Sequence, residues 1–262
     1  MLQALRSHWP EYLIEAACLG LFMVSANVFT TLIFHPASPF AHRLGDAVGA
    51  RFVMGLAMGG TAIALIFSPW GKRSGAHMNP ATTLTFFRLG RVGPWDAAFY
   101  VASQFGGGLA GTLVAAALLS RAIADPTVDY AVTVPGPWGP GAAFVAEIVI
   151  TFVLMLAVLV VSNTKRWARF TGFVAGALVA VYITFESPIS GMSMNPARTL
   201  GSAVFASRYT ALWIYFTAPL AGMLLAAEAY VRTGHARIAH CAKHHHENDQ
   251  PCIFRCRYGE LR

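Results

Sequence analysis

One eight-residue pattern occurs twice in this chain and constrains the fold more than any other feature. Residues 74–81 read SGAHMNPA and residues 190–197 read SGMSMNPA, so six of the eight positions are identical. Chance is a poor explanation for a match of this length, and we interpret it as the trace of an internal duplication. The rest of the chain should then divide into two related halves.

The composition indicates a protein that crosses a membrane several times. Of the 262 residues, 56% are hydrophobic and only 12% are charged, whereas soluble domains usually carry about 25% charged residues. The net charge of +7 could indicate a nucleic-acid partner, but the Lys and Arg residues lie in short loops and in the C-terminal tail. We therefore interpret them as charges that flank membrane spans and expect no nucleic-acid partner.

Six apolar runs are long enough to cross a hydrocarbon core of about 30 Å, and two others are too short. The predicted spans are residues 12–34, 50–69, 97–119, 142–162, 170–185 and 211–231. The short segments, Pro80 to Leu89 and Pro196 to Ala206, directly follow the two copies of the pattern. About ten helical residues cover only about 15 Å, so these segments enter the membrane without crossing it. The predicted fold is an all-α integral membrane protein with six transmembrane helices and two half-membrane re-entrant helices.

The two halves are expected to form an inverted internal repeat. Repeat one covers about residues 11–120 and repeat two about residues 142–231, with three spans in each. An odd number of spans turns the second half upside down relative to the first, so the two half-helices enter from opposite faces and meet near the midplane. Residues 1–231 would form one membrane domain, and residues 232–262 a flexible cytoplasmic tail rich in His and Cys.

Positive charges orient this arrangement. With both termini in the cytoplasm, most of the 19 Lys and Arg residues lie on the cytoplasmic side. The positive-inside bias therefore predicts a multi-pass protein of the cell membrane, plasma or inner, with both termini cytoplasmic.

Each copy of the pattern is a strong helix start. An Asn can cap a helix through its side-chain oxygen, and a Pro at the first helical position lacks the donor that would go unpaired there. The amide NH₂ groups of Asn79 and Asn195 are then left free, at the point where both half-helices present the positive ends of their dipoles. Such a point favours a neutral molecule with an oxygen acceptor and disfavours a cation.

The non-helical residues before each Asn can expose backbone carbonyls only where they line a polar cavity. We therefore expect these residues to line the two halves of a path through the membrane. They are Gly75, Ala76, His77 and Met78 in the first half, and Gly191, Met192, Ser193 and Met194 in the second.

Two carboxylates lie inside predicted spans at matching positions of the halves, Glu15 and Glu147. Intramembrane acids often mark proton relays, which would indicate an ion-coupled transporter. They can also accept hydrogen bonds from the backbone N–H groups of re-entrant loops, which need partners inside a membrane. The matching placement favours structural support.

The paired pattern resembles that of the aquaporins, the major intrinsic protein family of channels for water and small solutes. The resemblance covers about residues 11 to 231 and implies a channel domain with a pore in every subunit, a homotetramer, no enzymatic activity and no cofactor. The family's NPA motifs fall on Asn79, Pro80, Ala81, Asn195, Pro196 and Ala197. His77 would line the cytoplasmic vestibule.

The resemblance also implies an outer selectivity filter. Arg198 matches the arginine of the family's outer constriction, and Gly59, Ile183 and Met192 would lie opposite it. Strict water channels usually carry an aromatic residue at the first of these positions and His at the second, so Gly and Ile imply a wider and more apolar opening. In contrast, Thr199 stands where glycerol channels usually carry Asp, and Tyr215 with Phe216 resembles the aromatic pair of water channels.

The function expected from the sequence is a passive channel for water and small neutral solutes such as glycerol that excludes protons and ions. Two alternatives stay open: a small-solute facilitator with little water selectivity, and an ion-coupled secondary transporter, because inverted repeats with broken helices serve transporters as well.

The tail contains enough nitrogen and sulfur ligands for a soft metal, although its spacing matches no familiar metal module. We predict no metal site in the membrane portion. The candidates in the tail are Cys241, His244, His246, Cys252 and Cys256. Reduced thiols in a flexible segment are the alternative interpretation.

Overall fold

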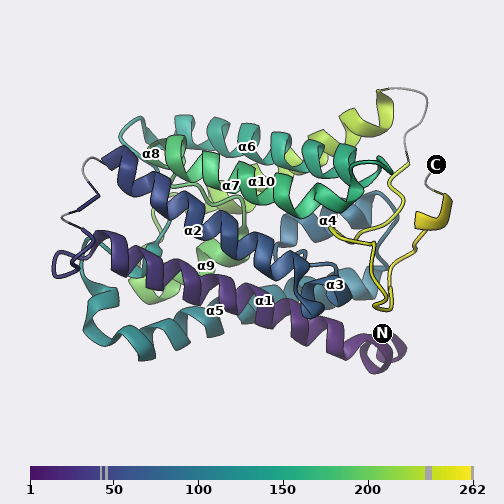
Figure 1. The fold of residues 1–262 in the computed structure, drawn as a ribbon, viewed down its shortest axis with the longest axis horizontal. Coiled ribbons are helices and arrows are strands. Elements are labelled where there is room, and N and C mark those ends of the chain that lie inside the picture. Colours follow the sequence, from purple (N-terminus) through teal and green to yellow (C-terminus); the bar gives the residue numbers. More distant parts are fainter. Residues whose placement is uncertain (42, 45–46, 234–237, 261–262) are drawn as a thin grey trace.

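The computed structural model describes residues 1–41, 43–44, 47–233 and 238–260. Within these residues the regular structure is helical (Figure 1). The α-helices are α1 (Leu2–Phe34), α2 (Ala47–Phe67), α3 (Pro69–Ser74), α4 (Pro80–Arg88), α5 (Pro94–Leu119), α6 (Gly139–Ser162), α7 (Thr171–Phe185), α8 (Ser187–Ser190), α9 (Pro196–Ala206) and α10 (Leu212–Arg232). Short 3₁₀ turns are η1 (Ser120–Ala124), η2 (Asp129–Ala131), η3 (Ala168–Phe170) and η4 (Tyr258–Glu260).

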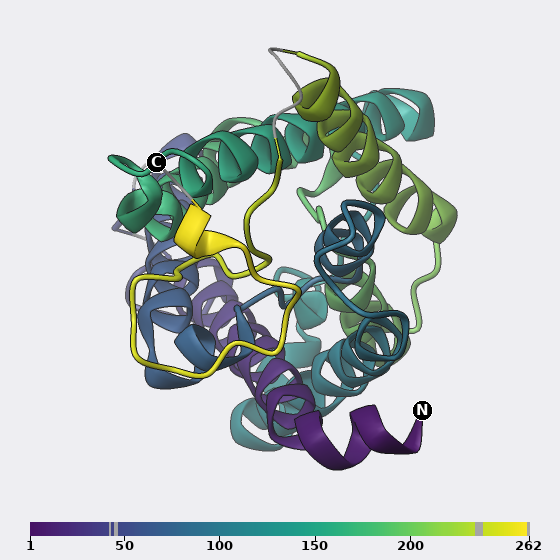
Figure 2. The same cartoon turned by 90° about the vertical axis from the view of Figure 1, so that its right-hand side faces the viewer.

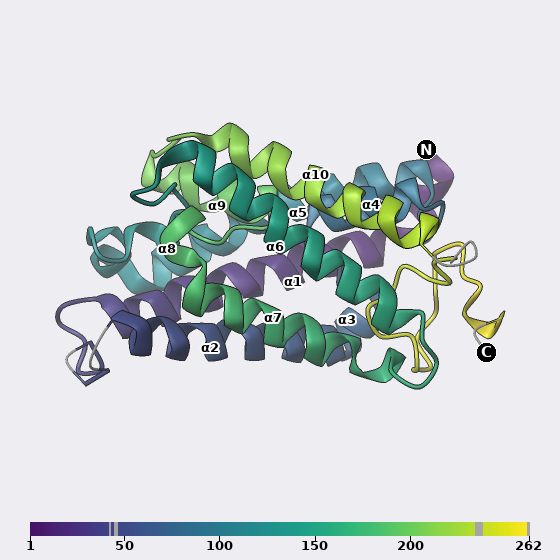
Figure 3. The same ribbon diagram turned by 90° about the horizontal axis from the view of Figure 1, so that it is seen from above.

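Six of the helical segments in the described residues are long and apolar enough to cross a membrane. They are α1, α2, α5 with η1, α6, α7 with η3, and α10, and they run side by side along the long axis of the molecule (Figures 1 and 3). The six predicted spans are therefore confirmed, with their ends shifted by a few residues. The largest shift is at α1, which begins at Leu2 rather than near Tyr12.

The helix contacts follow the inverted repeat. Helix α1 packs on α5 in the first half, as α6 packs on α10 in the second, and α2 packs on α7 across the halves. Each half-helix lies against the last span of the other half, α4 on α10 and α9 on α5. The two half-helices themselves begin at the prolines predicted for them, Pro80 and Pro196.

Glycines make the closest helix crossings possible. A β-carbon at Gly107 or Gly111 of α5 would overlap backbone atoms of Ala16 or Gly20 in α1. At the α2–α7 crossing, a β-carbon at Gly59 would overlap the carbonyl oxygen of Gly176. Small residues four apart bring helices together in membranes, where lipid gives no hydrophobic force between them.

The outer surface of the bundle is apolar, whereas its interior holds many polar groups. Large aliphatic side chains on the spans are more than half exposed, among them Leu13, Leu113, Leu118 and Val145, while Glu15, Asn27, Gln104 and Glu147 are fully buried. This distribution is the reverse of that in a soluble protein and fits a bundle surrounded by hydrocarbon.

Two segments outside the spans contact the helices: the loop between α5 and α6, and the tail that the sequence predicts to be flexible. The loop between α5 and α6 contains η1 and η2, and its later part bonds to α8 through Gly136 N–H and Ile189 O at 2.9 Å. The tail at residues 238–260 lies folded across one end of the bundle, at the same end as the start of α1 (Figure 2). The predicted tail residues 234–237 and 261–262 lie outside the described residues.

Candidate functional site

Each half-helix is capped by the asparagine predicted for that role. The Asn79 side-chain oxygen accepts the Ala81 N–H at 2.9 Å, and the Asn195 oxygen accepts the N–H groups of Ala197 at 3.0 Å and Arg198 at 3.2 Å. A proline follows each asparagine at the first helical position. The two caps therefore fix both amide groups where the half-helices begin.

The asparagine amides also join the two halves. Asn79 Nδ2 donates to Met194 O and Asn195 Nδ2 donates to Met78 O, both at 2.7 Å. Each amide thus uses one of its two N–H groups on the opposite loop. The expectation that both NH₂ groups are wholly free is wrong, because a buried carbonyl of the other half competes for them; one N–H of each asparagine is left.

A carboxylate holds the first re-entrant loop from inside the bundle. Glu15 Oε1 accepts the Ser74 hydroxyl at 2.7 Å and the His77 N–H at 3.0 Å, while Oε2 accepts the Met78 N–H at 2.6 Å and Gln104 Nε2 at 2.8 Å. The buried charge therefore has four donors around it.

A carboxylate holds the second loop in the same way, and we call each of these sets of carboxylate–loop hydrogen bonds a clamp. Glu147 Oε1 accepts the Ser190 hydroxyl at 2.8 Å and the Ser193 N–H at 2.7 Å, and Oε2 accepts the Met194 N–H at 2.8 Å. With both acids occupied by loop donors, the support role fits their geometry better than a proton relay does.

The clamps stabilise backbone that is locally strained. Four non-glycine residues have positive φ at matching places, Ala76 (54°) and Met78 (50°) in the first loop, Met192 (54°) and Met194 (55°) in the second. Such conformations cost about 1 kcal/mol or more each and persist where surrounding contacts impose them. The strain lies at the two loops on which the site is built.

Two adjoining cavities run along these loops. Both asparagines line the inner cavity, together with Ala76, His77 and Met78. The outer cavity is lined by Gly191 and Met192, and both cavities contact Ser193, Met194 and Arg198. The predicted lining residues of the second half therefore all face a cavity.

In the first half, the backbone carbonyls of Gly75 and Met78 are not free to line the path as expected. Gly75 lines neither of the two cavities, and its carbonyl oxygen accepts from the backbone N–H of His244 at 3.2 Å. The Met78 carbonyl does face the site, but it accepts from Asn195, as Met194 O accepts from Asn79. Contacts between segments distant in sequence occupy these oxygens.

Arg198 lies where the two cavities meet and is held from the outer loop. Its Nη1 donates to the Thr133 hydroxyl. The guanidinium remains beside the outer cavity, which Ile183 and Met192 also line. Three of the four predicted filter residues are thus brought together.

The fourth predicted filter residue, Gly59, does not lie with the other three. It lines neither cavity, because it faces α7, where its backbone approaches Gly176. Met58, the residue before it, is 2% exposed and lines the outer cavity. The ungapped count from the motif fails by one residue because the close α2–α7 crossing turns Gly59 away from the site.

The tail occupies the inner end of the site. His77 Nε2 bonds to Ala242 O at 2.8 Å, and the Phe254 ring stacks on His77 with centroids 5.2 Å apart. His244 lines the inner cavity, and its Nδ1 bonds to Gly75 O at 2.9 Å. Burial, and then the neighbouring His77 ring, lowers the pKa of His244 to about 4, so that its imidazole is neutral.

Comparison with known proteins agrees with this geometry. The family model described as "Major intrinsic protein" matches residues 9–230. The chain belongs to the major intrinsic protein family. Among curated members of this family, it is 37% identical over 185 residues to Aquaporin NIP6-1 of Arabidopsis thaliana, and 39% identical over 176 residues to Aquaporin NIP2-1 of Zea mays.

These alignments are partial on both sides. They cover 70% and 66% of this chain, and 58% and 57% of the two relatives, which is less than two thirds of each relative's length. The aquaglyceroporin from Plasmodium falciparum has a similar fold, with a TM-score of 0.69 at 21% identity, covering 87% of this chain and 97% of that chain. The all-α membrane fold with two half-helices is therefore the fold of the major intrinsic protein family.

The hydrogen-bonding roles of several residues in this family member's site were not found from the sequence. Thr133 lies in a Pro- and Gly-rich loop with no helical pattern, and Gln104 is one polar residue in an apolar span. Tyr100 and Tyr215 donate to the Ser74 and Ser190 carbonyls at 2.8 and 2.6 Å. These two tyrosines occupy matching places in the repeats, which is the signal that could have identified them.

Proposed function

We propose that this protein is a passive channel for water and small neutral solutes such as glycerol, with the path running through the two cavities. The observation that carries the proposal is the asparagine pair. Both amides are fixed at the starts of the half-helices, line the inner cavity and keep one N–H each for an oxygen acceptor. No enzymatic activity or cofactor enters this proposal.

Exclusion of protons and cations follows from the same groups. The positive dipole ends of α4 and α9 and the Arg198 guanidinium disfavour a cation along the path. A water held by its oxygen at the asparagines has its hydrogens turned away from them. An unbroken proton-conducting file is therefore difficult to form at this point.

The lining of the outer cavity favours solutes beyond water. Met58, Ile183 and Met192 present apolar surface beside two cationic residues, Arg51 and Arg198. A polyol can place its carbon backbone against that surface and its hydroxyl groups toward Arg198. We therefore include glycerol among the solutes. The basis for this is the apolar surface to which Met58 contributes, and not the small size of Gly59.

We further propose a homotetramer in the cell membrane with both termini cytoplasmic. The start of α1 and the described end of the tail lie at the same end of the bundle, as an even number of spans requires (Figure 1). The positive-inside bias assigns that end to the cytoplasm. Exposed aliphatic side chains supply surface for lipid or for neighbouring subunits.

The experiment is stopped-flow light scattering of proteoliposomes under osmotic gradients of an impermeant solute and of glycerol. It uses the full-length protein and its Phe254→Ala variant, because Phe254 stacks over the inner end of the site. Shrinkage with low activation energy, independent of proton and sodium gradients, is expected. Solute accumulation driven by an ion gradient would support the transporter alternative. Permeability of both proteins equal to that of empty vesicles would overturn the channel.

A further inference from the structure

The tail is a separate layer that is fastened to both halves of the bundle. His240 N–H donates to Asn163 Oδ1 at 2.6 Å, in the loop before α7. Arg255 N–H donates to Arg91 O at 2.8 Å, in the loop after α4. Between these two attachments the chain crosses the end of the bundle (Figure 2).

This layer closes the inner end of the candidate pore. Ala242 and Phe254 are 0% and 7% exposed, and both contact His77, while His244 enters the inner cavity. The contacts come from two stretches of the tail that are separated by ten residues or more in sequence. Hydrogen bonds join these stretches, among them Arg257 N–H to His240 O at 2.7 Å, but the regular structure of the described tail is limited to one short 3₁₀ turn, η4. Short segments with so little regular structure usually depend on a cross-link or a metal.

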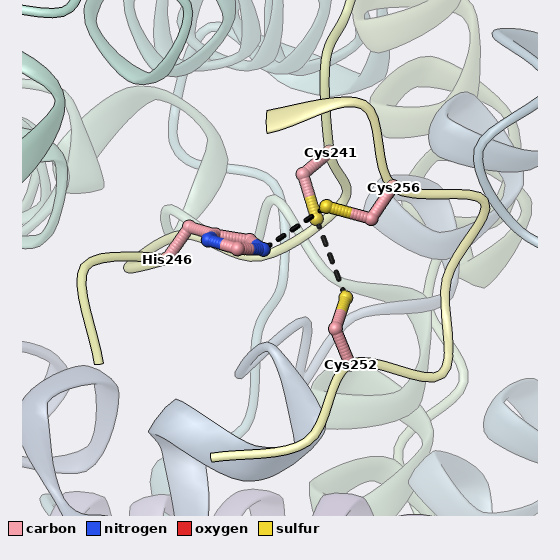
Figure 4. Close-up of side chains that lie close together, drawn as sticks. All are labelled: Cys241, His246, Cys252 and Cys256. Atoms are coloured by element: carbon pink, nitrogen blue, oxygen red, sulfur yellow. Dashed lines mark hydrogen bonds between the residues drawn. The ribbon is translucent and has the colours of Figure 1, made fainter. Parts of the chain in front are cut away.

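Four metal-ligating side chains meet within the tail. The Sγ atoms of Cys241, Cys252 and Cys256 and a ring nitrogen of His246 all lie within 4.8 Å of one another. Cys241 Sγ and Cys252 Sγ are 3.6 Å apart, and Cys256 Sγ is 3.0 Å from His246 Nε2. Figure 4 shows the four side chains pointing toward a common centre.

The donor set and the spacing fit a tetrahedral thiophilic cation. Zinc bound by thiolates at about 2.3 Å places neighbouring sulfurs about 3.8 Å apart, and Cys₃His is a common structural zinc set. The observed separations are close to this geometry. Lys243 lies beside the cluster, its Nζ bonded to the Gln250 and Pro251 carbonyls at 3.1 and 2.8 Å, and it offsets the excess negative charge of three thiolates.

We propose that Cys241, His246, Cys252 and Cys256 bind one thiophilic divalent cation such as Zn²⁺, and that this ion clamps the tail as a cap over the inner end of the pore. His244, a candidate from the sequence, is not part of the ligand set because it lines the inner cavity and its ring does not join the four groups that converge. A disulfide between Cys241 and Cys252 would use two of the four groups and leave the convergence of Cys256 and His246 unexplained.

Metal binding is tested on the full-length protein purified without a polyhistidine tag. Elemental analysis after loading with Zn²⁺ should give about one ion per chain, and Co²⁺ should give the visible and thiolate charge-transfer bands of a tetrahedral sulfur site. His246→Ala and Cys252→Ser should lose both signals. His245→Ala is the matched control from the same histidine run, since His245 lies outside the cluster, and it should keep them. Absence of stoichiometric metal in the unmodified protein, or its retention in His246→Ala, overturns the site.

The clamp is tested by removing the ion. Chelation should increase hydrogen exchange in the tail several-fold and raise osmotic water permeability several-fold, and His245→Ala should respond as the unmodified protein does. Metal binding with unchanged tail exchange and unchanged permeability on chelation would overturn the cap. The permeability readout rests on the proposed channel, whereas metal content and tail exchange do not. Stoichiometric metal with chelation-sensitive tail exchange, but no permeability in either state, would therefore refute the channel and leave the metal-clamped tail standing.

Discussion

At the scale of single residues, buried polar side chains are distinguished by the donors around them. Glu15 and Glu147 have hydrogen-bond donors on both oxygens, whereas neither carboxylate oxygen of the buried Glu186 has a hydrogen-bond partner among the described residues. Glu186, near the end of α7, is only 8% exposed. Burial alone therefore does not say which acid supports the loops; the hydrogen bonds do.

Replacing Glu15 by Gln should destabilise the protein, and the same change at Glu186 should not. Glu15→Gln places an NH₂ against two donors, and we expect a loss of about 3 kcal/mol. Glu186→Gln removes an unpaired carboxylate and should be neutral or stabilising. Thermal unfolding in detergent measures both midpoints. Equal midpoints for the two variants would contradict the clamp.

The width of the outer cavity should depend on Met58. Met58→Phe fills part of the cavity wall and should lower glycerol permeability several-fold more than water permeability, because glycerol has the larger cross-section. Leu56→Phe is the matched control, since Leu56 is 54% exposed on the outside of α2. Stopped-flow measurements with both solutes provide the comparison. A Met58→Phe protein with unchanged glycerol flux would remove Met58 from the proposed filter.

At the scale of helices, the positions of α1, α2, α5 and α7 depend on how closely their backbones approach. Pairs of glycines four residues apart lie at the α1–α5 and α2–α7 crossings. The same close approach of α2 and α7 explains why Gly59 packs against Gly176 while Met58 lines the outer cavity. A residue count along a helix gives its face only when the crossing partner is known.

A methyl group at the α1–α5 crossing should separate the helices. Gly107→Ala overlaps the Ala16 backbone, whereas Gly106→Ala meets no atom within 4 Å. We expect the first to destabilise the protein by a few kcal/mol through overpacking, and the second to be neutral or slightly stabilising through helix propensity. Unfolding midpoints of the two variants test this. Similar midpoints would show that the crossing tolerates a wider separation.

At the scale of the whole molecule, segments from both halves and the tail complete one site. Asn79 and Asn195 come from loops more than 100 residues apart, and each bonds to the other loop. The tail then contacts His77 and Gly75 at the inner end. The lining of the proposed path therefore depends on contacts between distant segments rather than on any one helix.

Weakening the tail contact should open the inner end. Phe254→Ala removes the ring that stacks on His77 and contacts Tyr100 edge to face, and we expect osmotic water permeability to rise several-fold. Ile238→Ala, at a tail residue that is 45% exposed, serves as the control and should leave permeability unchanged. The measurement is stopped-flow shrinkage at equal protein content. A Phe254→Ala permeability equal to that of the control would argue against a closed inner end.

The sequence by itself determined the repeated helix starts, the six spans and the two half-helices, because these depend on local chemistry: an Asn cap, a Pro at the first helical position and the length of an apolar run. It also identified Glu15 and Glu147, since a charged group inside an apolar segment needs a partner, whereas Arg198 was identified through the resemblance to the family.

Only the tertiary structure decided which partner each group has. Arg198 donates to Thr133, and the two asparagines donate to the carbonyls of Met78 and Met194. Met58 lines the outer cavity in place of Gly59, and the tail folds against His77. All of these features arise from contacts between residues far apart in sequence. Helical periodicity carries no information about such contacts, because it describes one element at a time. The four converging ligands of the tail are the clearest case, since their spacing along the chain matched no familiar module and only folding brought them together.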